Sequence, residues 1–300
     1  MSNYEVVLVF TSTFDIHVLD IRYSLFMRGF YMKKIPFYIT VFIIVAMSLL
    51  PFLWFVDTSL KTPLEITSIP PVLIPSGTLD AYRSAIDEYN LPHFVGNSII
   101  VSGLTTAITI IISIFTGYSL ARLRIKYKGL IMGSLLVVSM FPQITIAGPV
   151  WKLLQNLGWL NSYQGLIIPY VTLTLPLGVW IMASFFRELP EELEDASRID
   201  GCGHYQTLFK IMVPLAAPGM FTAAILVFIY AWNEFFFALL IMTRQKFQTL
   251  PVGIALFQGQ YTLPWGEIAA ASTVATVPLV VLVLLFQKRI VRGLSAGAVK

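Results

Sequence analysis

Long apolar stretches alternate with shorter polar segments along most of the chain. A helix needs about 20 mainly apolar residues to cross the hydrocarbon core of a bilayer. Six stretches approach or exceed that length, and each of them predicts a membrane-spanning helix. The predicted spans are Ile35–Val56, Phe94–Leu120, Leu130–Val150, Tyr163–Phe186, Gly219–Met242 and Glu267–Phe286.

The first 31 residues do not share this pattern. Their apolar run, Val6–Phe10, is too short to span a bilayer, and no small-residue cleavage site follows it. We therefore expect an N-terminal extension over 1–31 and a transmembrane domain over 32–300. Two interpretations of the extension stay open: it lies upstream of a natural start at Met32, or it is a cytoplasmic tail lying on the membrane.

Composition agrees with a membrane protein. Hydrophobic residues make up 57% of the 300 positions and charged residues only 12%, and the mean hydropathy is +0.78. A soluble domain of this size would expose too much apolar surface. No basic stripe interleaves with aromatic residues, so nucleic-acid binding is not expected. The single cysteine, Cys202, excludes an internal disulfide, and the three scattered histidines predict no metal site.

The distribution of Lys and Arg predicts the orientation of the spans, because cytoplasmic loops carry an excess of these residues. Of the 20 Lys and Arg residues, 15 fall on one predicted side of the membrane and 5 on the other. The larger group comprises Arg22, Arg28, Lys33, Lys34, Arg122, Arg124, Lys126, Lys128, Arg187, Arg198, Lys210, Lys288, Arg289, Arg292 and Lys300. The smaller group comprises Lys61, Arg83, Lys152, Arg244 and Lys246. We therefore expect a multi-pass protein of the cell (inner) membrane with both termini in the cytoplasm.

The polar segment 188–218 interrupts the apolar pattern on the predicted cytoplasmic side. It predicts a first helix that starts near Pro190 and stops at Gly201, since glycine accepts the left-handed backbone that ends many helices. A second helix is predicted over His204–Met212, before Pro214 and Pro218. The apolar face of the first helix is predicted to carry Leu189, Leu193, Ala196 and Ile199.

The same segment resembles the "EAA" signature of ABC-importer permeases. Asp195-Ala196-Ser197 is followed after three residues by Gly201, and after nine more by Ile211-Met212-Val213-Pro214. Asp195 stands where the family usually has Glu, and Ser197 where it usually has Ala. The resemblance implies a coupling helix that inserts into a cleft on a cytoplasmic ATPase subunit; the alternative is an ordinary amphipathic loop. The implied ATPase-coupling residues are Glu194, Asp195, Ala196, Ser197, Asp200, Gly201, Ile211 and Pro214.

Polar residues inside the predicted spans are candidates for a translocation path, because they are costly in a membrane. The candidates are Asn97, Gln143, Asn233 and Glu234. Glu234 lies in a Trp-Asn-Glu-Phe run that resembles the sugar-importer branch of the family. The structural alternative, a bond to a neighbouring helix, is favoured for Asn233 and Glu234, because adjacent helical positions point about 100° apart. Phe141-Pro142-Gln143 predicts a broken or kinked helix.

Sequence motifs for catalysis are missing. No Gly-x-x-x-x-Gly-Lys-Ser/Thr phosphate loop, Gly-x-Ser-x-Gly or His-Glu-x-x-His occurs. The chain is therefore not expected to be an enzyme or to hold a cofactor, and ATP is expected to bind partner subunits. An intramembrane enzyme would need paired catalytic residues inside the spans, and a secondary transporter driven by an ion gradient would need intramembrane ion ligands.

The resemblance covers about Met32 to Lys300. The ending Gly293–Lys300 is similar to that of the second permease of maltose/trehalose-type sugar importers, and its small residues favour an extended segment that reaches the ATPases. The family implies an all-α membrane protein with six transmembrane helices and a cytoplasmic coupling-helix loop between helices four and five. It also implies a second permease subunit, two ATPase subunits and an extracytoplasmic sugar-binding protein, all working in the lipid membrane.

Overall fold

The computed structural model describes residues 36–258 and 263–296, with side chains as far as Gln287. The predicted extension over 1–31 lies outside the described residues. All regular structure within the described ranges is helical, and no strand occurs there, so the all-α prediction is confirmed. The chain divides into two compact units, Met1–Val56 and Asp57–Lys300.

The described part of the first unit is one apolar helix. It begins at Pro36 and continues to Ser59, just past the boundary between the units, and its mean hydropathy of 2.5 suits a membrane span. The predicted span Ile35–Val56 corresponds to this helix. Three more helices are long and apolar enough to cross a membrane alone: α4 (Leu91–Arg122), α7 (Tyr163–Glu188) and the Trp265–Gln287 part of α14 (Trp265–Ala296).

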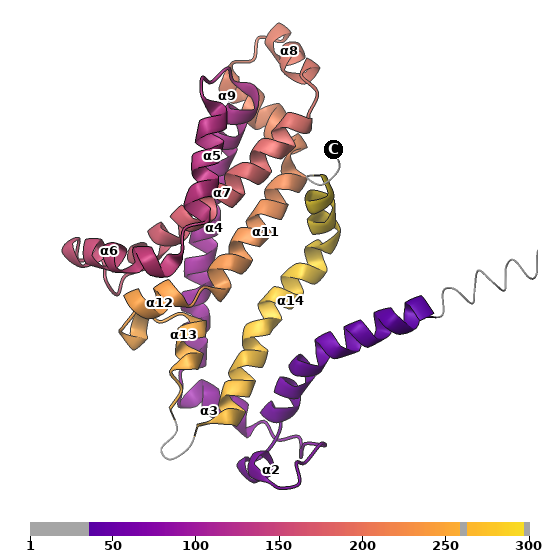
Figure 1. Ribbon diagram of the computed structural model, residues 1–300, viewed down its shortest axis with the longest axis vertical. Helices are drawn as coiled ribbons and strands as arrows, with labels where there is room; N and C mark the ends of the chain where they lie inside the picture. The colour runs from indigo at the N-terminus through magenta and orange to yellow at the C-terminus, as the bar shows by residue number, and fades with distance from the viewer. Residues whose placement is uncertain (1–35, 259–262, 297–300) are drawn as a thin grey trace, which may run out of the picture. The chain divides into compact units, whose positions relative to one another are not determined.

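The centre of the second unit is the packed pair α4 and α7, against which α11 (Ala217–Asn233) lies, with α14 beside α11 (Figure 1). Small residues let α4 and α7 approach closely. A Cβ atom added at Gly117 of α4 would lie 2.8 Å from the Cβ atom of Met182 on α7. The hydroxyls of Thr109 and Thr174 meet at 3.0 Å between the same two helices. Close backbones and hydroxyl bonds are how helices associate where there is no water to drive packing.

The third predicted span, Leu130–Val150, is not one continuous helix. Helix α5 covers Lys128–Ser139 and α6 covers Gln143–Asn156, and the two are bent by 92°. Pro142 lies at the break, where its ring and missing N–H prevent the helix from continuing. The predicted break at this position is confirmed, and the pair counts as one span only if a broken or re-entrant helix is accepted.

The fifth predicted span, Gly219–Met242, is also wrong as a continuous helix. Helix α11 ends at Asn233, Glu234 is extended with φ −67° and ψ 125°, and α12 covers only Phe236–Ile241. At its other end α11 follows a helical segment, His204–Leu215, at an angle of 76°. The described residues of the chain therefore contain up to six spans when each bent pair is counted as one, and the helix from Pro36 is one of these six.

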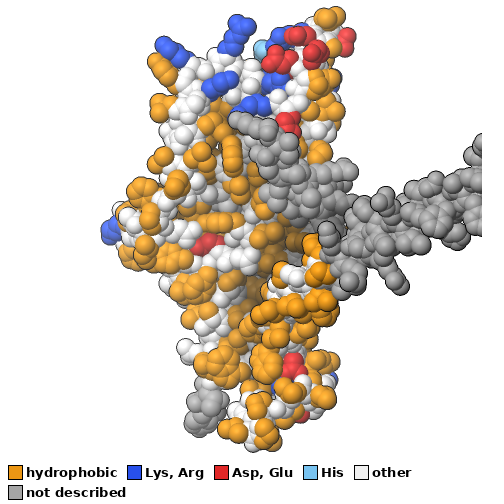
Figure 2. Space-filling model, turned by 45° about the vertical axis from the view of Figure 1, so that its right-hand side comes forward, with side chains coloured by type: hydrophobic (Ala, Val, Ile, Leu, Met, Phe, Trp, Pro, Cys, Tyr) orange, Lys and Arg blue, Asp and Glu red, His pale blue; other side chains and the backbone are white. Residues whose placement is uncertain are grey.

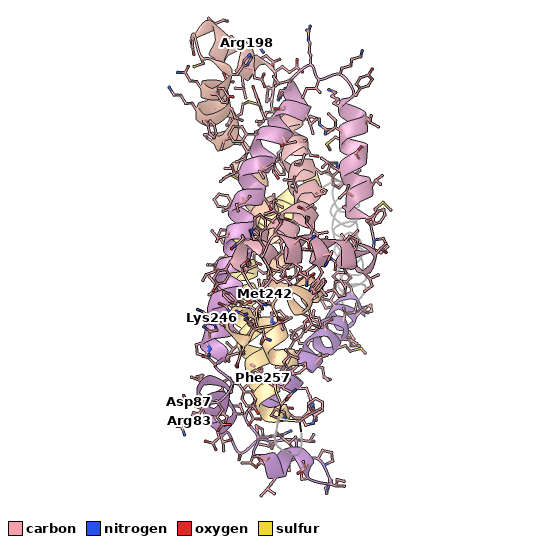
Figure 3. All side chains as sticks on the ribbon, turned by 90° about the vertical axis from the view of Figure 1, so that its left-hand side faces the viewer. Arg83, Asp87, Arg198, Met242, Lys246 and Phe257 are labelled. Carbon is pink, nitrogen blue, oxygen red and sulfur yellow. The ribbon has the colours of Figure 1, made fainter. Side chains whose placement is uncertain are left out.

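The second unit also contains short helices at and toward the end opposite the 188–218 loop. In Figure 3, Arg83 and Asp87 lie toward that end, Arg198 lies at the loop end, and Lys246 lies between them. These short helices are α2 (Pro63–Thr67), α3 (Asp80–Asp87), the 3-10 turn η2 (Gln245–Phe247) and α13 (Leu250–Ala255). Their core is a buried cluster that includes Leu91, Phe94 and Trp232. Charged side chains gather at the loop end, whereas the flanks of the unit are largely apolar (Figure 2).

The end of the chain differs from expectation. Helix α14 continues to Ala296, so Gly293 to Ala296 is helical and not extended. The last four residues of the predicted extended segment, 297–300, lie outside the described part of the chain.

Candidate functional site

The 188–218 loop folds into two helical segments joined at a glycine, as predicted. Helix α8 covers Glu192–Ile199, and Gly201 follows it with φ +76°, a left-handed conformation that a side chain would strain. The second segment is longer than predicted: α9 (His204–Thr207), a π-helical turn η1 (Leu208–Met212) and α10 (Val213–Leu215) follow one another without a gap. The segment continues one residue past Pro214 and ends at Leu215, at the bend before α11.

The buried face of α8 is not the predicted apolar one. Ala196 is exposed and Ile199 is 87% exposed, whereas Glu194 is 8% and Ser197 only 1% exposed. The reason is the neighbour against which α8 lies. The helix meets the polar end of α4 and the start of α9, so Glu194 and Ser197 point inward and make polar contacts. Of the predicted apolar face, Leu189 and Leu193 are half-buried, and Ala196 and Ile199 are exposed.

Arg122, the last residue of α4, links the loop to a membrane helix, in addition to the buried packing of Leu208 and Met212 against α4 and α7. Its Nε atom lies 3.4 Å from Oε1 of Glu194 in a charge contact in which neither atom makes a hydrogen bond, and only 6% and 11% of the two side chains are exposed. The guanidinium also donates a hydrogen bond to the backbone oxygen of Leu189. Two charges this buried are stable only as a pair, and removing one leaves the other uncompensated. The loop is therefore fixed to the end of a membrane helix by an ion pair that our reading of the sequence did not identify.

A second polar contact joins the two segments of the loop. The hydroxyls of Ser197 and Thr207 lie 2.9 Å apart, both residues are buried, and Ser197 also donates to the backbone oxygen of Glu194 at 2.7 Å. Ser197 thus departs from the usual alanine of the signature in a way that adds a hydrogen bond between α8 and α9.

The outward side of the loop combines acids with apolar side chains. Asp195 is 68% exposed and its only described ion pair, at 3.2 Å, is with Arg198 of the same helix. Among the exposed large hydrophobic residues, Tyr205 is 74% and Phe209 49% exposed, in addition to Ile199. The remaining predicted coupling positions also lie on or near this surface: Asp200, Gly201 and Pro214 are exposed, and Ile211 is half-buried.

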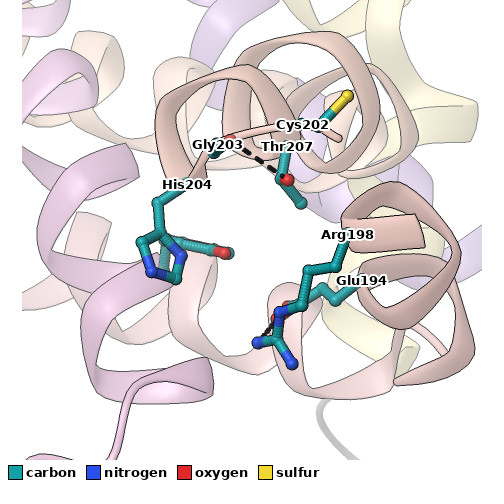
Figure 4. A pocket seen from close by; sticks show the side chains of 7 residues that line it. Glu194, Arg198, Cys202, Gly203, His204 and Thr207 are labelled. Atoms are coloured by element: carbon teal, nitrogen blue, oxygen red, sulfur yellow. Dashed lines mark hydrogen bonds and ion pairs between the residues drawn. The ribbon is translucent and has the colours of Figure 1, made fainter. Parts of the chain in front are cut away.

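A pocket of 180 Å³ separates α8 from α9 (Figure 4). Its lining includes Glu194 and Arg198 from α8, Thr207 and His204 from α9, and Tyr118 from α4. Arg198 lies 3.8 Å from Glu194 on the α8 side of the pocket. Among the described residues, no cluster of three His, Cys, Asp or Glu side chains could hold a metal ion here or elsewhere.

The four candidates for a translocation path do not come together at one surface. Asn97 is 2% exposed, and its amide donates to the backbone oxygens of Lys246 and Gln248 at 3.0 and 2.8 Å. Its own oxygen accepts a 2.7 Å hydrogen bond from the hydroxyl of Tyr163. Asn97 therefore ties α4 to the segment around η2.

Gln143 and Asn233 also make separate contacts. The Gln143 amide donates to the hydroxyl of Tyr230 at 2.6 Å, so it links the break before α6 to α11. Asn233 is exposed, and its amide donates at 2.8 Å to the backbone oxygen of Ile229, one turn earlier in its own helix. Of the four, Asn233 is the one whose side chain faces outward from the fold.

Glu234 lies at the break between α11 and α12 and is 7% exposed. Its carboxylate accepts hydrogen bonds from the backbone N–H groups of Phe237 at 2.9 Å and Ala238 at 3.2 Å, and a further one from the hydroxyl of Tyr170 on α7. The carboxylate thus caps the N-terminus of α12 and binds it to α7. The helical spacing argument for Asn233 and Glu234 rested on a continuous helix and fails, although a bond from Glu234 to a neighbouring helix is present.

Comparisons with known proteins agree with this architecture. The family model for "Binding-protein-dependent transport system inner membrane component" matches residues 109–296. The chain is 44% identical to the trehalose/maltose transport system permease of Thermococcus litoralis over 91% of its length and 99% of that protein. It is 42% identical to the sulfoquinovosyl glycerol transport system permease of Agrobacterium fabrum, over 91% and 96% of the two chains.

A third relative and one solved structure complete the comparison. The trehalose transport system permease of Mycobacterium tuberculosis is 41% identical over 86% of this chain and 94% of its own. A chain of a bacterial ABC transporter involved in alginate import has the same fold, with a TM-score of 0.74 at 19% identity over 86% and 96% of the two chains. No relative supports an ion-gradient-driven secondary transporter. The chain therefore belongs to the family of binding-protein-dependent transport system inner membrane components, the permease subunits of ABC importers.

Proposed function

We propose that this chain is one permease subunit of an ATP-driven sugar importer. It forms the translocation path with a second permease subunit and receives motion from two ATPase subunits through the 188–218 loop. An extracytoplasmic binding protein delivers the sugar. The relatives named for trehalose, maltose and sulfoquinovosyl glycerol support a carbohydrate with at least one glycosidic linkage as the substrate.

The observation that carries the coupling role is the two-sided character of α8. Its inward side is fixed to α4 by the ion pair between Arg122 and Glu194. Its outward side presents Asp195 and, one turn later, the exposed Ile199, and a surface of that kind fits a partner cleft better than water. Motion of a docked ATPase therefore reaches a membrane helix through a contact that is already in place.

The same proposal includes where ATP binds and which end of the unit faces the cytoplasm. ATP binds the partner subunits, and this chain holds no cofactor of its own. The loop end lies in the cytoplasm, where ATP is available. Charged residues gather at this end of the unit, as the Lys and Arg distribution of cytoplasmic loops requires (Figure 2).

The experiment that tests the function is transport into proteoliposomes by the complete complex, with ATP inside the lumen that faces the loop. The sugar panel includes trehalose, maltose, sulfoquinovosyl glycerol and a monosaccharide. We expect ATP-dependent uptake of at least one glycoside that requires the binding protein. Uptake driven by an ion gradient without ATP would contradict the proposal.

Two loop variants then test the coupling role. Asp195→Ala removes the exposed acid, and Gly201→Val forces a side chain into a left-handed backbone, although open space surrounds the glycine. We expect both variants to insert normally and to lose most transport. Glu192→Ala is the matched control, because it removes an exposed acid from the first turn of the same helix and should transport at the parental rate.

A further inference from the structure

A second site lies at the loop end of the unit, away from the coupling surface. A groove of 330 Å³ runs between the ends of α4, α5 and α7. Its lining comprises Leu120, Lys128, Gly129, Met132, Leu136, Trp180 and Arg187. None of these residues takes part in the polar contacts that hold the loop, so the coupling role does not account for the groove.

The rim of the groove carries two cations without described counter-ions. Lys128 begins α5 and Arg187 lies in the last turn of α7, and both are exposed. Neither has an ion pair among the residues that the structure describes, in contrast to Arg122, which faces Glu194 a short distance along the sequence from Lys128. Two cations converging on one groove favour an anion between them.

The walls of the groove are apolar. Leu120 is buried at its base, whereas Leu136 is 42% and Trp180 50% exposed. Trp180 belongs to a helix long and apolar enough to span a membrane, and tryptophan is enriched where hydrocarbon meets headgroups. A free inorganic anion would gain nothing from these walls. A ligand with a charged head and an apolar tail would contact both parts of the groove.

We propose that this groove binds one anionic phospholipid of the surrounding bilayer, a role beyond the proposed transport function. The phosphate lies between Lys128 and Arg187, and an acyl chain follows Met132, Leu136 and Trp180 toward the middle of the membrane. Basic pockets between membrane helices are a known physical means of holding anionic headgroups, because each Lys or Arg near the surface contributes to the attraction. The bound lipid would then contact both the start of α5 and the end of α7 and hold them together.

The test measures lipid retention by the purified complex. The complex is exchanged into detergent with defined lipid, and bound phosphatidylglycerol and phosphatidylcholine are counted by native mass spectrometry across a concentration series. We expect one tightly retained phosphatidylglycerol per copy of this chain and no matching phosphatidylcholine. In Lys128→Gln/Arg187→Gln, the affinity for phosphatidylglycerol should fall about 25-fold, since each lost cation weakens binding about fivefold.

Two further variants separate charge from shape. Arg124→Gln/Lys126→Gln removes the same charge from exposed positions outside the groove lining, and it should retain the lipid as the parent does. Met132→Trp keeps both cations and fills the groove, so it should lose the lipid. If Lys128→Gln/Arg187→Gln fails to assemble, Met132→Trp still decides whether the groove binds the lipid.

Three results would overturn the proposal. Equal retention of phosphatidylglycerol in the parent and in both groove variants would show that the groove holds no lipid. Displacement of the lipid by millimolar inorganic phosphate would indicate a free-anion site. A cross-link from Leu136→Cys to a partner subunit, in a complex that retains no lipid, would indicate that a protein helix covers the groove. Failure of transport does not enter this test, so the proposed function and the lipid site can fail separately.

Discussion

Two buried glutamates, one in the loop and one at a break in the membrane helices, are accommodated in different ways. Glu194 faces a cation, Arg122, which belongs to a different helix. Glu234 has no ion pair among the described residues and instead accepts hydrogen bonds from Tyr170 and from two backbone N–H groups of α12. The first carboxylate connects elements through opposite charges, and the second one through donors that carry no formal charge.

The difference suits the two locations. Near the edge of the membrane-spanning region, a mostly buried ion pair costs less desolvation than it would at the centre, and it can connect a polar loop to α4. Between α11 and α12, the first backbone N–H groups of α12 need an acceptor, and Glu234 supplies one from two residues before the helix. Another pair of opposite charges could therefore replace Arg122 and Glu194. The contacts of Glu234, in contrast, fix where α11 ends and α12 begins.

The largest expected effect comes from breaking the charged contact. Arg122→Met leaves the buried Glu194 with Arg198 of its own helix, at 3.8 Å, as its remaining cation, and loss of a buried ionic partner costs about 3 kcal/mol. Hydrogen exchange of peptides covering 192–215 should rise strongly in the assembled complex, because the loop is no longer held to α4. Arg124→Met removes a nearby exposed arginine and should leave the exchange unchanged. Unchanged exchange in both variants would mean that the ion pair does not hold the loop.

Breaking the contact between Glu234 and its uncharged donors should destabilise the complex slightly less. Glu234→Leu removes the cap of α12 and leaves the hydroxyl of Tyr170 without its acceptor, at a combined cost of about 2–4 kcal/mol. Glu234→Gln should fall between Leu and the parent, since one of the two carboxylate oxygens becomes an amide donor that faces other donors. The thermal transition of the purified complex in detergent measures the order of the three proteins.

Asn233 provides the control for that series. Its side chain is exposed and bonds only to its own helix in the described structure, so Asn233→Leu should leave the thermal transition near that of the parent. A Glu234→Leu protein as stable as the parent would contradict the capping role and would return Glu234 to the translocation path.

Some of these features could be predicted from the sequence and others could not. Apolar length located α4 and α7 to within a few residues, and Pro142 marked the break between α5 and α6. The break at Glu234 was missed because no Pro or Gly accompanies it and the apolar pattern continues to Met242. What ends the helix there is a carboxylate bonded to the helix that follows, together with a tyrosine from a distant span, and neither contact is visible in local pattern.

The inward face of α8 also could not be predicted from the local sequence pattern. The spacing of Leu193, Ala196 and Ile199 predicted an apolar inward side, but α8 packs on an arginine and a threonine and turns Glu194 and Ser197 inward. No local signal for the contact with the arginine is present in the sequence, because Lys and Arg near helix ends ordinarily reach the interface, as the exposed Arg187 does at the end of α7. The signature residues and their spacing located the loop, and only the fold distinguishes its two sides.

The smallest expected effect on stability concerns the joint between α8 and α9. Ser197→Ala removes one hydroxyl from a buried pair and should cost about 1 kcal/mol of loop stability, with Thr207→Val costing a similar amount. The double variant should cost clearly less than the sum, because the two hydroxyls share one bond. Hydrogen exchange of the loop in all four proteins measures this coupling, and strictly additive losses would exclude it.

The central claim is that α8 has an inward carboxylate that holds the loop and an outward carboxylate that serves the partner. The most direct measurement compares Glu194→Gln with Asp195→Asn in the assembled complex, following both hydrogen exchange of 192–215 and retention of the ATPase subunits in detergent. Glu194→Gln should raise the exchange. Asp195→Asn should leave it unchanged, since an exposed pair with Arg198 contributes at most about 1 kcal/mol, and should release the ATPases more easily. Parental retention of the ATPases in Asp195→Asn, or parental exchange in Glu194→Gln, would contradict the account.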